Sequence, residues 1–315
     1  MAIGLQQVDN LIPSKYLLEV ARDNIEGKIS IDEAGRRITG YYKKNPVKTA
    51  QEHYEREADV VSARIAKILS TSAFSFGLAE LINIHRTSFQ DLFDPKIVGK
   101  IRNYDISKDE PILNGASVIY GRADSIKSTL IFDFNQEKNF QYQGLSKRAK
   151  VEQLAKFAAG IWQIHPFGEG NTRTTAVFMI KYLRTLGFMT NNDMFEAHAK
   201  YFRNALVRAN YQDLANDISY TLEYLNKFFG NLLLGEKNTL DNREMQLKVG
   251  KSKEKILRLI AENPKISTDV LADLTGLSVS GVEKNLRQLK QQNLIRRIGP
   301  AKGGYWEVAR DLSKI

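Results

Sequence analysis

The sequence of 315 residues has no cysteine. Disulfide bridges, thiolate metal sites and cysteine nucleophiles are therefore excluded, and the composition suits a reducing compartment. The sequence also has no run of 18 apolar residues, and its first residues lack a basic segment followed by a long apolar one. These absences lead us to expect a cytoplasmic protein with no membrane span and no membrane partner.

Length and charge allow more than one kind of partner. At roughly 150 residues per domain, the chain is long enough for two or three domains with their own cores. Lysine and arginine number 46 against 36 aspartate and glutamate residues, which gives a net charge of +10. This excess is compatible with binding to a polyanion, and equally compatible with solvated basic surfaces that bind nothing.

A polar loop between two helical stretches is the most informative segment. Residues 165–173 read His-Pro-Phe-Gly-Glu-Gly-Asn-Thr-Arg, and residues 151–164 and 174–186 carry apolar side chains at helical spacing. The loop therefore ends one helix and begins another, whose first backbone N–H groups lack an intrahelical partner and favour an anion. Gly168 and Gly170 let the backbone approach that anion closely. The segment predicts a site for the phosphates of a nucleotide.

The loop resembles the signature of the Fic family, His-Pro-Phe-x-(Asp/Glu)-Gly-Asn-Gly-Arg-x-x-Arg. Members of this family transfer a nucleotide monophosphate, usually AMP, onto protein hydroxyls. Seven of the eight specified positions from His165 to Arg173 match, and a weaker resemblance extends over residues 50–232. The resemblance implies a mainly α-helical protein, with a Fic-type helical core and a small β-hairpin flap.

The resemblance also implies a role for each matching residue. His165 would be the general base that takes the proton from the target hydroxyl, and Glu169 would bind Mg²⁺. Asn171 would hold the α-phosphate of the donor, and Arg173 the β-phosphate. These roles suit the residue types, since histidine titrates near neutral pH and one carboxylate with phosphate oxygens is a typical magnesium site. The residues expected to line the nucleotide site are Phe167, Gly168, Gly170, Asn171, Thr172 and Arg173.

Two positions depart from the signature. Thr172 replaces the second glycine of the motif, and Ala176 stands in place of the second arginine. In the family that arginine binds the γ-phosphate and pairs with an inhibitory glutamate, so its loss leaves the donor open, with ATP as the first expectation. The nearest counterpart of the inhibitory motif is residues 23–27, preceded by Arg22 where the family has serine or threonine. We therefore interpret Glu26 as a solvated or capping residue.

Turn residues and apolar spacing divide the rest of the chain. A capping-box pattern at residues 30–33 predicts a helix to about Tyr42, and helical spacing continues over residues 47–70, 77–93, 195–210 and 211–234. Residues 105–124 would be the flap, which in the family pairs with the backbone of the target; a surface loop is the alternative. The expected parts are an N-terminal helical segment (1–46), a Fic domain (47–234), a linker (235–253) and a winged helix-turn-helix domain (254–315).

The last of these parts is predicted from three helices and a hairpin. Residues 255–262, 267–274 and 279–291 have helical spacing, and residues 294–298 and 305–308 predict two strands around a glycine-rich turn. The third helix would be the recognition helix, and the hairpin would be the wing. The side chains expected to contact DNA are Lys284, Asn285, Arg287, Arg296, Arg297 and Lys302.

The sequence leaves two alternatives open for the partner and two for the function. Basic residues outnumber acidic ones by 12 to 6 in residues 251–310, which favours phosphate contacts with duplex DNA, but winged helices also dock proteins or pair two chains as a homodimer. We expect an enzyme, a protein adenylyltransferase (AMPylase) that uses ATP and Mg²⁺ and modifies a Ser, Thr or Tyr hydroxyl. The alternative is a nucleotide-sensing, DNA-binding transcriptional regulator with a weak or inactive Fic site. The sequence favours the enzyme because a sensor needs no general base.

Overall fold

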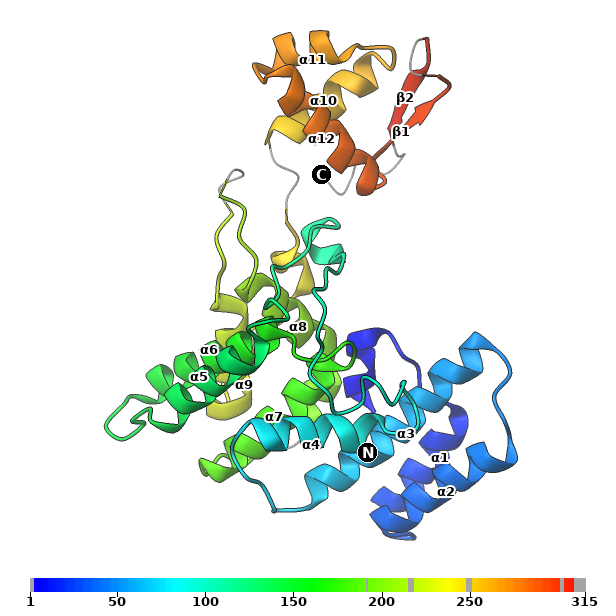
Figure 1. Cartoon of the computed structure of the whole chain (residues 1–315), viewed down its shortest axis with the longest axis vertical. Coiled ribbons are helices and arrows are strands. Elements are labelled where there is room, and N and C mark those ends of the chain that lie inside the picture. Colours follow the sequence, from blue (N-terminus) through cyan, green and yellow to red (C-terminus); the bar gives the residue numbers. More distant parts are fainter. Residues whose placement is uncertain (1–2, 191, 215–217, 248–250, 301–302, 309–315) are drawn as a thin grey trace. The chain divides into compact units, whose positions relative to one another are not determined.

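The computed structural model describes residues 3–190, 192–214, 218–247, 251–300 and 303–308. Helices dominate these residues, as the sequence predicts (Figure 1). In chain order the elements are η1 (Gly4–Asp9), α1 (Lys15–Ile25), α2 (Ile31–Lys44), α3 (Ala50–Ser70), α4 (Leu78–Phe89), η2 (Pro111–Leu113), α5 (Ile126–Lys138), α6 (Lys147–Ile164), α7 (Asn171–Thr185), α8 (Asp193–Ala209), α9 (Glu223–Leu234), η4 (Asn242–Met245), α10 (Lys251–Glu262), α11 (Thr268–Thr275), α12 (Val279–Gln291), β1 (Ile295–Ile298) and β2 (Tyr305–Val308).

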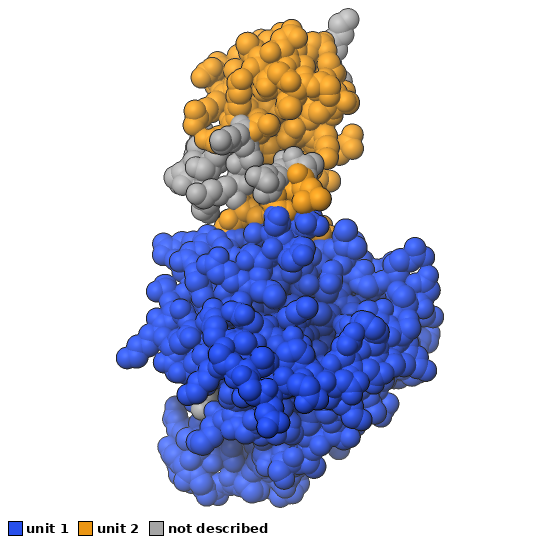
Figure 2. Space-filling view, turned by 90° about the vertical axis from the view of Figure 1, so that its left-hand side faces the viewer, with its two compact units in different colours: residues 1–107, 118–212, 219–245 blue, residues 108–117, 213–218, 246–315 orange. Residues whose placement is uncertain are grey.

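The chain divides into two compact units, which Figure 2 shows in different colours. The first unit comprises residues 1–107, 118–212 and 219–245, and the second comprises residues 108–117, 213–218 and 246–315. No helix in the described part of the chain is long and apolar enough to cross a membrane.

Hydroxyl side chains begin several helices of the first unit. The Ser30 hydroxyl accepts a hydrogen bond from the backbone N–H of Glu33, so the predicted helix start at residue 31 is confirmed. The Glu33 carboxylate pairs with Arg36 and Arg37, and the Ser30 hydroxyl forms the serine half of a capping box. A complete capping box, formed by Thr49 and Glu52, begins α3.

Helix α7 forms the centre of the first unit. Every residue from Asn171 to Leu183 is buried, and the helix packs against α3, α4, α6 and η1. A helix enclosed on all sides is a core element rather than a surface one. Aromatic rings of three other segments and of α7 itself fill the space along it: Phe74, Phe76, Phe134, Phe157, Phe178 and Tyr182.

The N-terminal helices α1 and α2 pack against α3 around a buried carboxylate. Asp59 of α3 is fully buried and accepts hydrogen bonds from the backbone N–H and hydroxyl of Ser14 and from the hydroxyl of Tyr42. Ser14 caps α1 and Tyr42 lies on α2, so one side chain holds both helices. Burial is the largest influence on Asp59, and it raises the pKa of this carboxyl.

The flap differs from the predicted β-hairpin. Residues 105–124 contain the short helix η2 and no strand. Pro111 has no N–H to donate to a ladder, and Asn114 and Gly115 have φ angles of 55° and 82°, which turn the chain sharply. The tip of the flap instead contacts residues that precede α10: Leu247 N donates to Ile112 O (3.1 Å), and the Asn114 amide donates to Leu247 O (3.1 Å).

Of the helix predicted for residues 211–234, the described residues form an α-helix from Glu223 onward, and residues 215–217 lie outside the described residues. Asp213 and Ile218 form an isolated antiparallel bridge, and Thr221 N donates to Arg208 O, so the chain turns before α9 begins. Aromatic residues of α8 and α9 then pack together in the core of the first unit: Phe195, Phe202, Phe228 and Phe229. Tyr201, beside Phe202, is buried too.

The second unit contains the three helices and the hairpin expected of a winged helix-turn-helix. Ser267 and Ser278 cap α11 and α12, and Gly276 ends α11 with a φ of 74°. Strands β1 and β2 pair antiparallel, with Arg297 opposite Trp306. The core of the unit is apolar and includes Ile256, Leu257, Ile260, Leu271, Val282, Leu286, Leu289, Ile295 and Trp306.

Candidate nucleotide-transfer site

The loop at residues 165–170 joins α6 to α7 in the way the sequence predicts. His165 is the residue after α6, with a left-handed φ of 51°, and Gly170 precedes α7 with a φ of 74°. The first intrahelical bond of α7 runs from Thr174 N to Gly170 O. The N–H groups of residues 171–173 therefore precede the hydrogen-bond ladder of the helix, at the end where its dipole favours an anion.

His165 is buried and its ring is held from two sides. Nδ1 lies 3.1 Å from the carbonyl oxygen of Trp162, which can only accept, so Nδ1 carries a proton. In the neutral imidazole Nε2 is then the atom that can accept a proton. The ring of Tyr120, from the flap, packs on the imidazole at 4.3 Å between centroids.

Asn171 and Phe167 brace the loop from within. The Asn171 side chain accepts from Phe167 N (2.9 Å) and donates to Phe167 O (2.8 Å), so both ends of its amide are engaged with the loop backbone. Phe167 is 1% exposed, and its ring stacks on that of His85 of α4 at 3.9 Å between centroids, so it anchors the loop in the core. Both residues stiffen the backbone on which a phosphate would rest.

His85 supports the same loop from α4, and nothing in the local sequence pattern pointed to it. Its Nδ1 accepts from Gly99 N (2.9 Å), so its Nε2 donates to the Glu169 carbonyl oxygen (3.0 Å). Burial is the main cause that lowers the pKa of His85 to about 4, and the ring is neutral at physiological pH. This neutral ring fixes the backbone of Glu169 while the carboxylate of that residue is exposed.

The two glycines of the loop lie against protein side chains. A Cβ atom at Gly168 would lie 2.6 Å from the Tyr104 hydroxyl, and one at Gly170 would lie 2.5 Å from the Phe89 ring. Gly170 also needs its positive φ. Close packing therefore accounts for both glycines in the structure, besides the approach to an anion that the sequence suggested.

Arg173 is engaged inside the protein. Its side chain is 2% exposed; Nη2 lies 2.7 Å from Glu57 Oε1 of α3, and Nε lies 2.8 Å from Asp9 Oδ2 of η1. Nη1 donates to Gln6 Oε1 (2.9 Å), and the guanidinium covers the Phe89 ring at 4.7 Å. A phosphate that binds Arg173 must exchange at least part of this arrangement.

The two departures from the family signature are both buried. The Thr172 hydroxyl accepts a hydrogen bond from Trp162 Nε1 (2.9 Å), so it has a structural use in this chain. Ala176 is 0% exposed within α7, and a methyl group stands where the family has a second cation. Glu26, the nearest counterpart of an inhibitory glutamate, caps the C-terminus of α1 and forms an ion pair with Lys28 at 2.5 Å.

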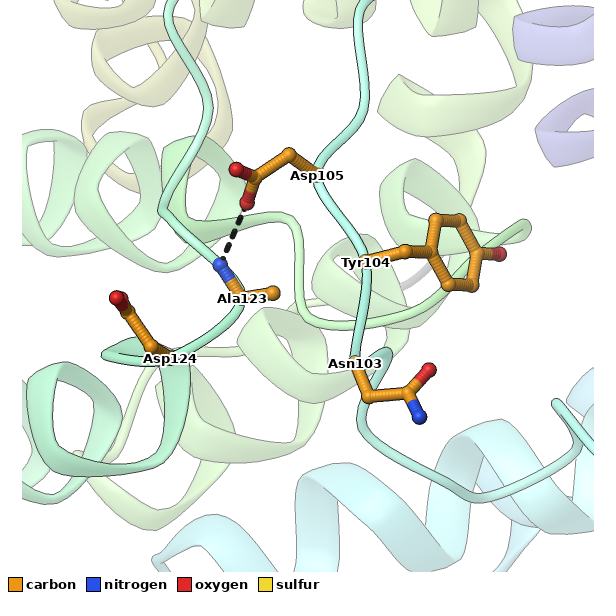
Figure 3. Close-up of a pocket in the computed structure, with 5 residues that line it drawn as sticks. All are labelled: Asn103, Tyr104, Asp105, Ala123 and Asp124. Atoms are coloured by element: carbon orange, nitrogen blue, oxygen red, sulfur yellow. Dashed lines mark hydrogen bonds between the residues drawn. The ribbon is translucent and has the colours of Figure 1, made fainter.

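A shallow pocket of about 370 Å³ lies at the base of the flap, between its two arms (Figure 3). Asp105 and Ala123 face each other across it, and Ala123 N donates to Asp105 Oδ1 (2.8 Å). Asn103, Tyr104 and Asp124 complete its lining. The pocket adjoins the loop because the Tyr104 hydroxyl lies beside Gly168.

The candidate DNA contacts on α12 and the hairpin have different surroundings. Lys284 and Arg287 are exposed on α12, whereas the Asn285 amide donates to Gly281 O (2.8 Å). On the hairpin, Arg296 pairs with Glu307, and the Arg297 guanidinium lies 4.8 Å from the Trp306 ring. Lys302 lies outside the described residues.

Comparison with known proteins matches two parts of the chain to protein families. Residues 75–183 match the Fic/DOC family, and residues 241–296 match the winged helix-turn-helix DNA-binding family. The chain thus contains a Fic/DOC family domain followed by a C-terminal winged helix-turn-helix domain. No curated protein matches it.

Several solved structures of Fic proteins are similar to the chain. A Fic family protein from Desulfovibrio desulfuricans G20 is 13% identical with a TM-score of 0.43, and the match covers 98% of this chain and 87% of that one. The BepC protein of Bartonella tribocorum, with bound AMPPNP, is 20% identical with a TM-score of 0.46 and coverage of 60% and 90%. The N-terminal Fic domain of a Bep effector from Bartonella quintana, with bound ADP, is 19% identical with a TM-score of 0.47 and coverage of 60% and 88%.

Proposed function

We propose that the chain transfers a nucleotide monophosphate, AMP from ATP, to a Ser, Thr or Tyr hydroxyl of a target protein. One observation carries the proposal. A single short loop combines a histidine of fixed tautomer, an exposed carboxylate and the start of a buried helix. General base, metal ligand and anion site are the parts that such a transfer needs.

In the proposed step the hydroxyl oxygen of the target forms a bond to the α-phosphorus of the donor. The bond between the α-phosphorus and the oxygen that bridges to the β-phosphate breaks, and pyrophosphate leaves. The hydroxyl proton passes to Nε2 of His165, because Nδ1 is held by the Trp162 carbonyl. The N–H groups of residues 171–173 offset the negative charge on the phosphate oxygens.

The donor set fits Mg²⁺ only together with a nucleotide. The described residues hold no group of three or more His, Asp or Glu side chains able to bind a metal ion. Glu169 offers one exposed carboxylate in the loop, and magnesium in nucleotide sites takes one or two carboxylates with phosphate and water oxygens. When bound there, the ion would offset charge on the phosphates of the donor.

The cations near the loop limit how the donor is held. Ala176 provides no charge for a γ-phosphate, and Arg173 has two carboxylates within 2.8 Å. The helix N-terminus and Glu169 with its metal ion therefore carry most of the donor binding in this proposal. We expect weak nucleotide affinity and no strong requirement for a third phosphate.

A donor panel tests the proposal directly. The full chain is incubated with Mg²⁺ and ATP, GTP, UTP or a CDP-linked compound, together with a lysate as the source of targets, and proteins are analysed by mass spectrometry. We expect the mass increase of one adenylyl group, which is AMP less one water, on a Ser, Thr or Tyr residue, seen with ATP. A transferred group other than a nucleotide, or none from any donor, would overturn the proposal.

A second function is supported by the C-terminal unit, namely binding of duplex DNA. Lys284 and Arg287 are exposed on the helix that enters the major groove in domains of this class. Fluorescence anisotropy of the full chain with duplex DNA across a salt series tests it, and binding should weaken as salt rises. Light scattering of the full chain and of a chain ending before α10 tests the alternative, in which the C-terminal unit docks a protein or pairs two chains. Salt-insensitive or undetectable DNA binding, with a change in oligomer size on truncation, would favour docking of protein or a homodimer.

A further inference from the structure

Arg102 precedes the flap and lies at its junction with the loop. Its side chain is 0% exposed. Nε donates to the carbonyl oxygen of His165 (2.8 Å), and Nη2 donates to the carbonyl oxygens of Ile164 (3.2 Å) and Gly121. Nη1 donates to the carbonyl oxygen of Tyr104 (2.6 Å). One guanidinium therefore binds four backbone carbonyls.

Geometry rather than charge pairing holds this cation. The Asp105 carboxylate is 4.0 Å from Nη1 and its side chain is 71% exposed, so it offers a weak ion pair. Burial lowers the pKa of Arg102, because a charged guanidinium loses its hydration inside the protein. Four carbonyl acceptors offset that loss, and they match the planar fork of five N–H donors that arginine has and lysine lacks.

Two of the four carbonyls belong to the end of α6. Ile164 is the last residue of the helix and His165 follows it in the left-handed region, so their carbonyls have no intrahelical donor. Arg102 supplies that donor, and its own backbone N–H donates to Pro166 O (2.9 Å). The conformation of the backbone that carries the His165 ring thus depends on Arg102.

The other two carbonyls lie at the two arms of the flap. Tyr104 directly precedes the first arm and lines the pocket of Figure 3, and Gly121 lies on the second arm. Gly121 passes close to α6, because its N–H donates to Gln163 O (3.2 Å) and a Cβ atom would lie 3.0 Å from Ile164 O. A side chain at position 121 would therefore press on the Ile164 carbonyl and shift the junction by a few tenths of an ångström.

We propose that Arg102 is a positioning residue that fixes the general base relative to both arms of the flap. The inference rests on the proposed transfer function, since it assigns a residue to that same site. Arg102 is directed at carbonyl oxygens and binds neither donor nor metal. It acts through the backbone of His165, and loss of the fork should lower turnover more than nucleotide binding.

Arg102→Lys tests this, because lysine keeps the charge and loses the fork. We expect kcat to fall about 100-fold, the cost of a misplacement near 1 Å, while KM for the nucleotide stays within about threefold. Arg122→Lys is the matched control, since Arg122 lies on the flap, is exposed and pairs with Asp124. Gly121→Ala perturbs the same junction while Arg102 stays intact. It should likewise lower kcat and leave KM for the nucleotide nearly unchanged.

Amide hydrogen exchange provides a second measurement, which does not depend on catalytic activity. In Arg102→Lys, amide exchange should rise in peptides covering residues 102–106, 119–123 and 163–166, and stay unchanged in α7 and in α10 to α12. Unchanged exchange at the junction, or a rise across the whole first unit, would overturn the positioning role. If the wild-type chain shows no transfer while the local exchange pattern appears, the proposed function fails and the role of Arg102 in fixing the loop stands.

Discussion

Glu57→Gln should lower the stability of the protein and raise its nucleotide affinity. Glu57 and Asp9 both pair with the Arg173 guanidinium, which is 2% exposed. Removing one partner of a buried ion pair costs roughly 3–5 kcal/mol. Asp9 and Gln6 remain, and the Glu57 side chain is 19% exposed, so we expect a loss of about 2 kcal/mol, or about 5 °C in Tm.

The same substitution leaves Arg173 with less negative charge around it. An incoming phosphate then competes with one carboxylate instead of two, and we expect the Kd for ATP to fall about tenfold, equal to about 1.4 kcal/mol. Differential scanning calorimetry and isothermal titration calorimetry measure the two effects. Glu152→Gln is the control, because its pair with Arg148 is exposed on α6 and should be worth less than about 1 kcal/mol. Nucleotide affinity that falls together with stability would refute the reasoning.

Four further substitutions test other parts of the structure. Glu169→Gln should raise the Mg²⁺ concentration needed for transfer at least about tenfold and lower the rate, since a neutral amide is a poor ligand for a hard cation; a magnesium titration of the rate decides it. His85 has a pKa of about 4 against 6.5, so the unfolded chain takes up a proton first as pH falls, and the stability due to neutral His85 is complete above about pH 6.5 and lost toward pH 4. His85→Gln should therefore remove up to about 3 kcal/mol of this pH dependence, measured by urea unfolding from pH 4 to 7.5; an unchanged slope would contradict the low pKa. Lys284→Ala and Arg287→Ala should each reduce the salt dependence of DNA binding by about one phosphate contact in the anisotropy series, with equal effects on unrelated sequences if the contacts are to phosphate.

Local features of the fold could be predicted from the sequence because they are encoded locally. The loop lies between two helices at the predicted place, since apolar spacing ends at Ile164 and Gly170 marks the next start. The helices of the winged-helix unit also agree with those predicted from the sequence, because their caps and turns lie within a few residues of each helix end. Helix α5 was missed, because exposed Ile131 and Phe132 obscure the buried face of Ile126, Leu130 and Phe134.

Contacts over long sequence distances could not be predicted in this way. Arg173 contacts Gln6 and Glu57 across 167 and 116 positions, and His85 contacts the Glu169 backbone across 84. Nothing in the local pattern around Arg102 shows that it will cap a helix that ends 62 residues later. The family resemblance implied a hairpin flap, but the carbonyls of Tyr104, just before the flap, and of Gly121 bind Arg102 instead of forming a ladder.

The central claim is that His165 is the base of a transfer reaction, and His165→Ala tests it most directly. Transfer of AMP to the target is followed by mass spectrometry in a single turnover, and ATP binding is measured on the same preparation by calorimetry. We expect transfer to be lost while the Kd for ATP stays within about tenfold, because a base acts in the transition state; His53→Ala, an exposed histidine of α3, should leave both unchanged. Full transfer by the His165→Ala variant, or equal losses of binding and transfer, would contradict the claim.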